Sequence, residues 1–597
     1  MVDARYRWVF PAPVTLDPSF REAGERLGIS TRLMAVLAAR GVAATADLDA
    51  FFGPPEAGLH DPGLLPDAAA FSDRIARARA TGERVLVFGD FDADGLTGLA
   101  IMTRALGRLG IDAIPYVPSR VDEGHGLSLV AVETALAAAV TLIVTVDCGT
   151  TSGAEIAAAA ATGIDVIVTD HHRVPPVLPP AVAVVNPHRS DSVYPDRRLA
   201  GSGVAFKLAQ LLLREEPGDQ AQAFDLADLA TIGTVADLAP IVGENRAIAR
   251  LGLERLRRDP RPGIAALLVR ARVEPADVDL ETISFAIAPR LNAAGRVGEA
   301  LGAARLLLTD DAAEAVALAD GLETANRTRR DLMRQAVEEA RAVVGADDAA
   351  HADRAAIIVR GDWPVGIVGL VASRLAEDLG RPAIVGANLG AVVRASCRSD
   401  GSLDLGAALE ACGDLFTRFG GHAGAAGFEL PVERWEEFSV QFQRLAGASP
   451  RPDPRPVLRL DVALAAIEVD YALHRELGSL GPCGTGNPDP LVAILGLTVT
   501  RVRAATGGHA QLTLRRTLDV LDGIAFDRSD LVDSVREGDR VDVVGRLVSR
   551  RFGGYESLQV EIRDVSASGS HAEAAAILGQ PARTVIAAAT LLAGGAA

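Results

Sequence analysis

Short apolar runs recur in the first part of the chain, each followed by a polar turn. The runs at 85–88, 142–146 and 164–169 show little alternation of apolar with polar residues, which is typical of strands buried on both faces of a parallel sheet. Between the first two runs, residues 96–109 place leucine and methionine three or four positions apart, as an amphipathic helix requires. This alternation predicts an α/β domain built on a parallel sheet.

A long helical pattern interrupts this alternation. Residues 312–344 keep helical periodicity throughout, and we expect this helix to connect two domains, with Arg327, Arg329 and Arg330 on its exposed side. Strand and helix patterns resume at residue 355. They predict a second, smaller α/β domain.

The last part of the chain has the pattern of antiparallel strands. Residues 510–515 and 558–563 alternate apolar and polar side chains, which predicts a small barrel, either of the OB type that binds single strands or a plain scaffold. A proline-rich linker precedes it. The predicted parts are an N-terminal helical lead-in (1–50), an α/β domain (51–310), a connecting helix (311–346), a second α/β domain (347–450), a barrel (456–566) and a poorly ordered, alanine-rich tail (567–597).

Composition is that of a folded, soluble protein. Hydrophobic residues make up 49% and charged residues 23% of the 597 residues, and no run approaches the ~18 apolar residues of a membrane span. The first residues carry no signal-peptide pattern. We therefore expect a cytoplasmic protein with no membrane association. The four cysteines form no C-x-x-C pair, which fits a reducing compartment and argues against a zinc site.

The net charge of −18 does not decide whether the chain binds nucleic acid. Net charge governs solubility and long-range steering, whereas phosphate contacts depend on local clusters of cations. Lys207 is the only lysine. Any phosphate site must therefore rely on arginine, whose guanidinium group binds phosphate through two hydrogen bonds.

Acidic residues and histidines follow the predicted buried strands. Three aspartates occupy alternate positions within 90–94, Asp147 ends the second run, and Asp170, His171 and His172 end the third. Clustered carboxylates repel one another unless cations lie among them. A calcium loop of the EF-hand type would need flanking helices and a later glutamate, and a solvated acidic turn would not follow a buried strand. The pattern predicts a metal site at one edge of the sheet.

The ligand types indicate the metal and the chemistry. Carboxylates and imidazoles without thiolates favour Mn²⁺ or Mg²⁺. Asp237 follows a predicted helix at 226–236, where a carboxylate opposes the helix dipole, which favours a ligand role over an ordinary helix end. Two metal ions among carboxylates suit phosphoryl chemistry, because they activate a water and neutralise the leaving oxygen. The residues alone therefore indicate metal-dependent hydrolysis of a phosphate ester.

Three further features are weaker signals for anion binding. Arg120 follows a short predicted strand and is either a solvated charge or an anion clamp. Arg290 and Arg296 lie among small residues, which suit a ligand or tight helix packing. The glycine-rich stretch 420–427 contains His422, and exposed backbone N–H groups beside a histidine suit a phosphate.

The chain resembles the RecJ family of single-strand-specific exonucleases, within the DHH phosphoesterase superfamily. The resemblance spans residues 37–564. The motifs that carry it are Gly89-Asp-Phe-Asp-Ala-Asp-Gly95, Val146-Asp-Cys-Gly149, Asp170-His-His172, Gly233-Thr-Val-Ala-Asp237, Pro289-Arg-Leu-Asn-Ala-Ala-Gly-Arg296, Gly420-Gly-His422 with Ala425-Ala-Gly427, and Leu480-Gly-Pro-Cys-Gly-Thr-Gly-Asn-Pro488.

The resemblance implies a parallel-sheet DHH domain, a connecting helix, a smaller α/β DHHA1 domain and an OB-type barrel. It implies a 5′→3′ exonuclease that uses two Mn²⁺ or Mg²⁺ ions to release 5′-mononucleotides from single-stranded DNA, in DNA repair and recombination. By the family pattern, the metal ligands are Asp90, Asp92, Asp94, Asp147, His171 and Asp237, and His172 completes the catalytic set by orienting the substrate or the attacking water. The implied substrate-binding residues are Arg120, Arg290, Arg296, Ser396, Arg398, Gly421 and His422.

The resemblance also bears on partners. It implies single-stranded DNA with a 5′ end as substrate, and a single-strand-binding protein and a helicase as partners, although the chain shows no motif for either protein. We expect a monomer. The chain departs from the family pattern at Trp363-Pro-Val-Gly366, where Trp-His-Pro-Gly is usual, and at His125, where tyrosine is common.

Two other functions fit parts of the sequence. One is a DHH phosphodiesterase for short oligonucleotides or cyclic dinucleotides, but such proteins generally lack a C-terminal barrel. The other is a non-catalytic single-strand-binding replication factor, which would more readily have lost its metal ligands.

Overall fold

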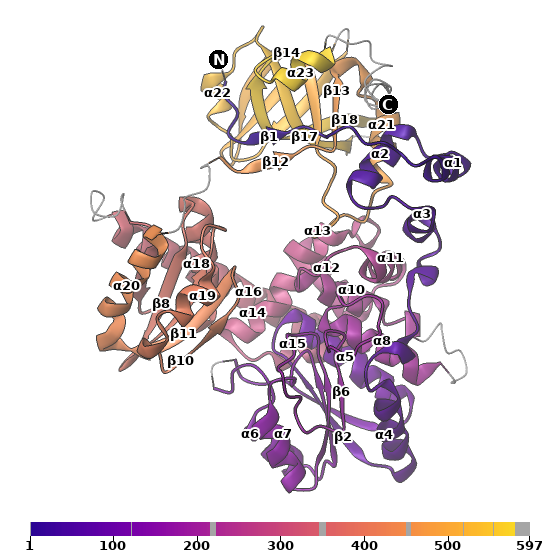
Figure 1. Cartoon of the computed structure of the whole chain (residues 1–597), viewed down its shortest axis with the longest axis vertical. Helices are drawn as coiled ribbons and strands as arrows, with labels where there is room; N and C mark the ends of the chain where they lie inside the picture. Colours follow the sequence, from indigo (N-terminus) through magenta and orange to yellow (C-terminus); the bar gives the residue numbers. More distant parts are fainter. Residues whose placement is uncertain are drawn as a thin grey trace, which may run out of the picture. The chain divides into compact units, whose positions relative to one another are not determined.

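The computed structural model describes residues 2–120, 122–214, 223–345, 354–448, 455–516, 519–552 and 555–578. The chain divides into two compact units. One is Leu59–Pro452, and the other joins Met1–Gly58 to Asp453–Ala597. Figure 1 shows the elements of each unit.

The first unit is built on the predicted parallel sheet. Its strand order is β3-β2-β4-β5-β6, and every neighbouring pair is parallel. The strands are β2 (Arg84–Gly89), β3 (Asp112–Tyr116), β4 (Leu142–Val146), β5 (Asp165–Thr169) and β6 (Ala183–Val185).

Helices cover both faces of this sheet, which explains the unbroken apolar runs. Val85 and Val87 face one layer of helices, while Leu86 and Phe88 face the other, and all four side chains are essentially inaccessible. Figure 1 shows the two layers on opposite sides of the strands. The first layer contains α4 (Ala68–Thr81), α5 (Ala93–Arg108) and α8 (Gly201–Leu213), and the second contains α6 (Leu129–Ala137) and α7 (Gly153–Ala161).

Further helices pack outside α5 and α8. Glu244, on one of these helices, forms a buried ion pair with Lys207 on α8 at 3.0 Å, and both side chains are at most 1% exposed. The Tyr194 hydroxyl donates a hydrogen bond to Glu244 at 2.6 Å, and Lys207 donates one to the carbonyl of His60 at 2.7 Å. The helices are α10 (Ala227–Ala236), α11 (Gly243–Arg258), α12 (Pro262–Ala271), α13 (Leu280–Thr282), the π-helix η4 (Ile283–Ile287), α14 (Ala288–Val297) and α15 (Leu301–Leu308).

The long helix α16 (Ala312–Gly345) leads to a second, mixed sheet in the same unit. The order of this sheet is β10-β11-β9-β8-β7, with only β7 and β8 parallel. Its elements are β7 (Ile357–Gly361), α18 (Val365–Leu379), β8 (Ala383–Leu389), β9 (Val392–Arg398), α19 (Leu405–Glu410), β10 (Arg418–Gly421), β11 (Ala425–Pro431) and α20 (Trp435–Ala448).

The second unit contains a closed barrel. Strands β14-β15-β16-β18-β17 follow one another in the sheet, and pairing of β14 with β17 closes it. The strands of this unit are β1 (Arg7–Val9), β12 (Val457–Arg459), β13 (Val462–Ala465), β14 (Val492–Ala505), β15 (His509–Arg515), β16 (Val520–Ala525), β17 (Arg540–Phe552) and β18 (Tyr555–Ala567). Its helices are α1 (Pro18–Arg26), α2 (Thr31–Ala39), α3 (Thr45–Phe52), α21 (Tyr471–Gly478), α22 (Leu531–Ser534) and α23 (Ala572–Leu578).

The N-terminal segment packs on the barrel. Strand β1 pairs in parallel with β12, and Phe20, Met34 and Leu37 share an apolar core with barrel residues. Asp564, which is fully buried, accepts hydrogen bonds from Trp8 Nε1 at 2.9 Å and Arg528 Nη1 at 3.1 Å. The N-terminal helices are therefore part of the unit that holds the barrel.

The expected disorder of the whole tail is wrong for residues 567–578. Helix α23 forms there because Ala574 is buried in an apolar cluster with Trp8 and Val544, and His571 stacks on Trp8 at 4.5 Å between ring centroids. Residues 579–597 of the predicted tail and 451–454 of the predicted linker lie outside the described residues. No helix among the residues placed in the structure is long and apolar enough to cross a membrane.

The buried ion pair yields a stability prediction. We expect Lys207→Met to lower the free energy of unfolding by ~3–5 kcal/mol, because it leaves the Glu244 charge buried without a cation. Chemical denaturation monitored by circular dichroism measures the loss. Arg84→Met is the matched control, since Arg84 and Asp112 form a pair whose side chains are 47% and 64% exposed, and the expected loss there is below ~1 kcal/mol. Equal losses in the two variants would contradict the prediction.

Candidate functional site

Three aspartates meet at the carboxyl edge of the parallel sheet. Asp90, Asp147 and Asp170 each directly follow a strand, and the strand ends are in register, with Gly89 opposite Val146 and Val146 opposite Thr169. The backbone ladder continues one residue further, because Asp90 N donates to the Val146 carbonyl and Asp147 N to the Thr169 carbonyl. The predicted convergence of acidic residues on one edge is therefore confirmed.

Backbone N–H groups hold the next two aspartates. Asp92 is the N-cap of α5 and accepts hydrogen bonds from the N–H groups of Asp94 and Gly95 at 3.0 and 3.1 Å. Asp94 accepts from Gly201 N at 2.7 Å and Ser202 N at 2.9 Å, at the start of α8. The amides at two helix N-termini thus orient these carboxylates and favour their charged form.

Two glycines allow the backbone to approach the carboxylates closely. A Cβ on Gly201 would lie 2.5 Å from Asp147 Cβ, and one on Gly233 would lie 2.5 Å from Asp94 Oδ1 and 2.2 Å from Ser202 Oγ. No larger side chain fits at either position without moving an aspartate. Gly233 begins the motif that ends at Asp237.

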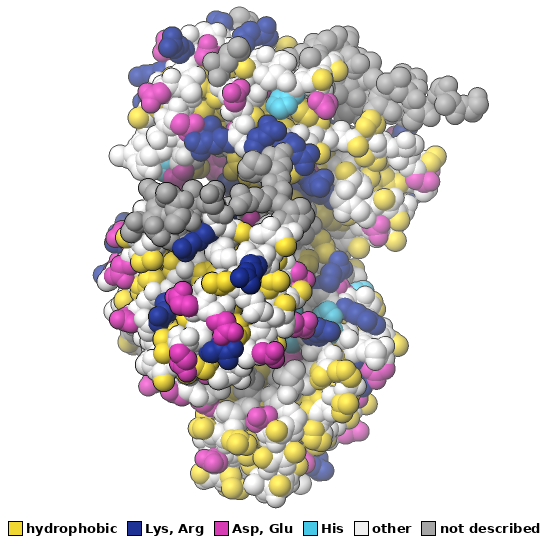
Figure 2. Space-filling view, turned by 60° about the vertical axis from the view of Figure 1, so that its left-hand side comes forward, with side chains coloured by type: hydrophobic (Ala, Val, Ile, Leu, Met, Phe, Trp, Pro, Cys, Tyr) yellow, Lys and Arg dark blue, Asp and Glu magenta, His cyan; other side chains and the backbone are white. Residues whose placement is uncertain are grey.

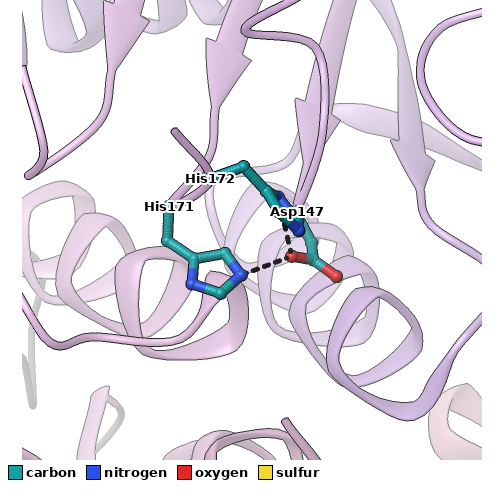
Figure 3. Close-up of side chains that lie close together, drawn as sticks. All are labelled: Asp147, His171 and His172. Carbon is teal, nitrogen blue, oxygen red and sulfur yellow. Dashed lines mark ion pairs between the residues drawn. The ribbon is translucent and has the colours of Figure 1, made fainter. Parts of the chain in front are cut away.

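Several buried ligand atoms face one another without forming a hydrogen bond. Asp147 Oδ1 and His171 Nε2 lie 3.0 Å apart, and both imidazoles of the His171–His172 pair point towards the Asp147 carboxylate (Figure 3). Both of these atoms and Asp90 Oδ1 are buried without a hydrogen-bond partner among the residues the structure describes. Asp147 also has a φ of 64°, a strained backbone that non-glycine residues adopt mainly at functional sites. A cation between these atoms would satisfy them.

The ligand-type side chains form two triads with no residue in common. In each triad, one oxygen or nitrogen per residue lies within 4.8 Å of the other two. The first triad is Asp90, Asp92 and Asp147, and the second triad is Asp94, His171 and Asp237. The six predicted ligands are therefore brought together. A further combination, Asp147, His171 and His172, bridges the triads.

Burial and mutual repulsion oppose ionisation of these carboxyl groups. Burial, reinforced by the Asp90 and Asp94 charges, raises the pKa of Asp92 to about 6. Burial and the charges of Asp94 and Asp92 raise the pKa of Asp237 to about 8, and burial likewise raises the pKa of Asp147. Divalent cations would reverse this effect, since they favour the ionised carboxylates. The site therefore fits the predicted metal ions.

The two histidines have different electrostatic settings. His172 Nδ1 donates a hydrogen bond to Asp170 Oδ1 at 2.8 Å, and this bond raises the pKa of His172 to about 9. Asp170 also accepts from three backbone N–H groups, those of Thr150, His171 and His172. Burial instead lowers the pKa of His171. His171 is thus suited to bind metal as neutral imidazole, and His172 to meet an anion as imidazolium.

Arginines gather beside the first triad. The Arg120 guanidinium lies 4.7 Å above the ring of Phe91, and the His125 ring contacts the same phenyl group, with its Nδ1 3.1 Å from Asp90 Oδ2. Burial, together with the nearby charges of Arg120 and Arg329, lowers the pKa of Arg296 to about 10. An anion would relieve this crowding of cations.

Ser396 and Arg398, on β9, lie against α18. A Cβ on Gly369 would be 3.2 Å from Arg398 Nη2 and 3.5 Å from Ser396 Oγ. Burial and the nearby charge of Arg120 lower the pKa of Arg398. The charge of Arg398 in turn contributes to the lowered pKa of Arg296. These side chains form one cationic region with Arg120 and Arg296.

The structure places the remaining predicted residues elsewhere. Arg290 is buried, with its Nε 2.7 Å from Glu323 on α16 and its Nη1 donating to the Ala286 carbonyl. Gly421 and His422 are exposed at the β10–β11 hairpin, where His422 N donates to the Ala425 carbonyl at 2.8 Å. Arg290 and His422 form no ion pair with a triad residue among the described residues.

The sequence reasoning missed three contributors to the site. Asp170 was predicted at the sheet edge but given no role of its own, although it accepts hydrogen bonds from the backbone of both histidines and from the His172 ring. Gly201 was overlooked, and its position in the small-residue run 200–203 was the available signal. The expectation that Arg329 is exposed is wrong. It is half-buried because α16 packs against α14 and α18 there.

Comparison with known proteins identifies the family. Residues 84–234 match the DHH family N-terminal domain, residues 353–447 the DHHA1 domain and residues 460–564 the RecJ OB domain. The single-stranded-DNA-specific exonuclease RecJ of Bacillus subtilis (strain 168) is 33% identical over 577 residues, which cover 95% of this chain and 72% of that protein. The chain belongs to the RecJ family.

Solved structures of family members confirm the fold class. The crystal structure of RecJ from Thermus thermophilus in complex with Mn²⁺ matches with a TM-score of 0.79 and 32% identity, covering 95% of this chain and 81% of that one. Its complex with Mg²⁺ matches with a TM-score of 0.73 and 30% identity, covering 95% and 79%. That RecJ thus holds either metal, and this chain has acidic groups suited to a divalent cation.

Gly233 offers a structural test of the second triad. We expect Gly233→Ala to weaken Mn²⁺ binding ~10–100-fold, because the added methyl displaces Asp94 and the groups that orient it. Isothermal titration calorimetry measures the affinity. Gly302→Ala is the control, since a Cβ there meets no atom within 4 Å. Unchanged Mn²⁺ affinity in Gly233→Ala would show that Asp94 is not held in place by this contact.

The raised carboxyl pKa values predict how metal stabilisation depends on pH. In metal-free protein, the raised pKa values of Asp92 and Asp237 contribute stability below about pH 4 that is lost as pH rises through about 6 and 8. Mn²⁺ binds the ionised groups and removes their repulsion. We expect the rise in unfolding temperature on adding Mn²⁺ to be larger at pH 8 than at pH 5.5. Asp237→Asn should flatten the dependence above pH 7, and a rise independent of pH would contradict the assignment.

Proposed function

We propose that this chain is a single-strand-specific DNA exonuclease that removes 5′-mononucleotides in the 5′→3′ direction. The observation that carries the proposal is the pair of triads, in which six carboxylate and imidazole groups converge on one sheet edge. The family membership supports it, because the curated RecJ relatives are single-stranded-DNA-specific exonucleases.

We propose two Mn²⁺ or Mg²⁺ ions, one for each triad. Asp90, Asp92 and Asp147 would hold one, and Asp94, His171 and Asp237 the other. When bound, such ions supply an activated water and charge stabilisation for the leaving oxygen. Asp94 and Asp92 are already oriented by backbone amides, so the protein prepares their geometry before the ions bind.

His172 is proposed to contact the scissile phosphate. Its bond to Asp170 keeps Nδ1 protonated and fixes the ring, which leaves Nε2 to donate to a phosphate oxygen. An imidazolium there would favour the extra negative charge that develops during hydrolysis. The Asp170–His172 pair thus serves the substrate, while His171 serves the metal.

The cationic region of Arg120, Arg296, Ser396 and Arg398 is proposed to bind the 5′-terminal phosphate. None of the three arginines has a carboxylate within ion-pair distance among the described residues, so their charges are available to a ligand. Binding of the terminal phosphate beside the first triad would set the polarity of cleavage. Arg290, Gly421 and His422 are kept as candidate substrate contacts, although Glu323 occupies Arg290 in this structure.

The acidic net charge does not oppose DNA binding. Dark blue arginine and magenta acidic side chains are interspersed over the face shown in Figure 2, which is not uniformly acidic. The closed barrel is proposed to bind the single strand, as OB-type barrels do. Its presence disfavours the short-substrate phosphodiesterase, and the complete ligand set disfavours the non-catalytic replication factor.

The remaining assignments follow from this function. We propose action in DNA repair and recombination, a cytoplasmic location where DNA is available, a monomeric state, and a single-strand-binding protein and a helicase as partners. The proposed DHH and DHHA1 domains span 51–310 and 347–450, the connecting helix 311–346 and the barrel 456–566. The N-terminal segment 1–50 is proposed to support the barrel.

The activity is tested with oligodeoxynucleotides labelled at either end, with and without a 5′-phosphate, in Mn²⁺. We expect mononucleotides to be released stepwise from the 5′ end, and Asp147→Ala to lower the rate at least ~10³-fold because the first triad loses a ligand.

The rival functions predict different products from the same assay. Cleavage restricted to di- to pentanucleotides would favour the short-substrate phosphodiesterase. Strand binding without cleavage, measured by fluorescence anisotropy, would favour the replication factor. Mononucleotide release from the 3′ end would contradict the proposed polarity.

A further inference from the structure

A fourth strand of the parallel sheet delivers a polar residue to the edge where the aspartates meet. Asn186 directly follows β6, next to Val185, whose carbonyl accepts a hydrogen bond from Asp170 N at 3.0 Å. Asn186 is completely inaccessible to solvent. Unlike the aspartates that follow β2, β4 and β5, its side chain carries no charge and can both donate and accept hydrogen bonds.

The carboxamide of Asn186 connects the loops that follow β4, β5 and β6. Its Nδ2 donates to the His172 carbonyl at 2.9 Å and to Thr150 Oγ1 at 3.2 Å. Its Oδ1 accepts from the backbone N–H of His188 at 2.9 Å. These partners fix which end of the amide is which, because the His188 N–H can only donate and the His172 carbonyl can only accept. Both N–H groups of Nδ2 are thus used.

Asn186 closes a cycle of hydrogen bonds around the backbone of His172. Thr150 N donates to Asp170 Oδ2 at 3.0 Å, and Asp170 Oδ1 accepts from both the backbone N–H and the ring Nδ1 of His172. Asp170 and Thr150 are each 1% exposed, so water does not compete for these bonds. The His172 side chain, by contrast, is 56% exposed. An accessible imidazole is therefore held from a buried base.

We infer that Asn186 is a positioning residue for His172, and that its two N–H groups set the place where His172 Nε2 meets the substrate. Asp170 holds the amino side of His172 and one nitrogen of its ring, whereas Asn186 holds the carbonyl side. Without Asn186, the backbone of His172 would be held at one end only. A misplacement of about 1 Å in a catalytic group is enough to lower a rate strongly. The inference rests on the proposed function, in which His172 contacts the scissile phosphate.

The effect of Asn186 should be confined to His172. Among the described residues, the side chain of Asn186 makes no hydrogen bond to a member of either triad. The backbone of His171 is held separately, because its N–H donates to Asp170 Oδ1 at 2.8 Å. Loss of the Asn186 amide should therefore disturb the group that meets the phosphate and leave the metal ligands in place.

The first test changes the amide of Asn186 in two ways. Asn186→Asp keeps the size of the side chain and the oxygen that accepts from His188, but it loses both donors. Asn186→Ala loses the same donors without adding a charge. We expect both variants to lower kcat roughly 10–100-fold on a 5′-phosphorylated single strand. KM, and Mn²⁺ affinity measured by calorimetry, should stay within about threefold of wild type, because the strand and metal contacts remain.

Asn245→Asp is the matched control for a general loss of stability. Asn245, on α11, is equally buried, and its Nδ2 also donates to two acceptors, the carbonyls of Arg198 and Pro240. We expect a comparable fall in unfolding temperature and a change in kcat below about twofold. A fall in kcat as large as that of Asn186→Asp would overturn the inference. Should the charge in Asn186→Asp prevent folding, the comparison is made with Asn186→Ala.

The second test asks whether Asn186 acts through His172. In a His172→Ala background, with enzyme in excess over substrate, we expect Asn186→Ala to lower the rate less than about threefold, because both changes remove the same function. A loss as large in that background as in the wild type would overturn the inference, and so would an unchanged kcat in both Asn186 variants. If the wild type itself releases no nucleotides, the proposed exonuclease function fails instead.

Discussion

Repulsion among buried carboxylates is the constraint on which the rest of the first unit depends. Two unit charges about 4 Å apart repel by ~4 kcal/mol at an effective dielectric constant of 20, and the two triads together contain five aspartates. The protein lowers this cost with backbone amides at the N-termini of α5 and α8. Burial, together with the repulsion that remains, raises the pKa values of Asp92 and Asp237. Divalent cations would neutralise the negative charge that these carboxylates share.

Holding charged groups so close requires a rigid and tightly packed surrounding. Gly201 and Gly233 bring α8 and α10 within van der Waals distance of Asp147 and Asp94, which no side chain would allow. The Lys207–Glu244 pair ties α8 to α11 behind this layer. Because a buried ion pair broken on one side is costly, it favours a single arrangement of these helices. The position of the ligands is therefore set partly by residues that contact neither metal nor substrate.

The sequence predicted the grouping of the candidate ligands well and the surroundings of the arginines less well, for a physical reason. A residue directly after a buried parallel strand has little choice of position, so Asp90, Asp147 and Asp170 could be placed at one sheet edge from local pattern alone. An arginine on a helix reaches several partners, and tertiary packing decides which. Arg290 is consequently paired with Glu323, whereas Arg329, which the pattern placed on an exposed face, lies in a pocket. The pairing of β1 with β12 is similarly non-local and leaves no local signal.

The division of charge between the two triads and the arginines explains how an acidic protein can act on an acidic polymer. Long-range repulsion from a net charge of −18 is screened within about 10 Å at 0.1 M salt. Contacts within the site are partly buried and screened much less. The charges of Arg120, Arg329 and Arg398 all lie close enough to Arg296 to help burial lower its pKa, so an anion that enters meets several cations at once. Affinity is then concentrated where the strand must be positioned for cleavage.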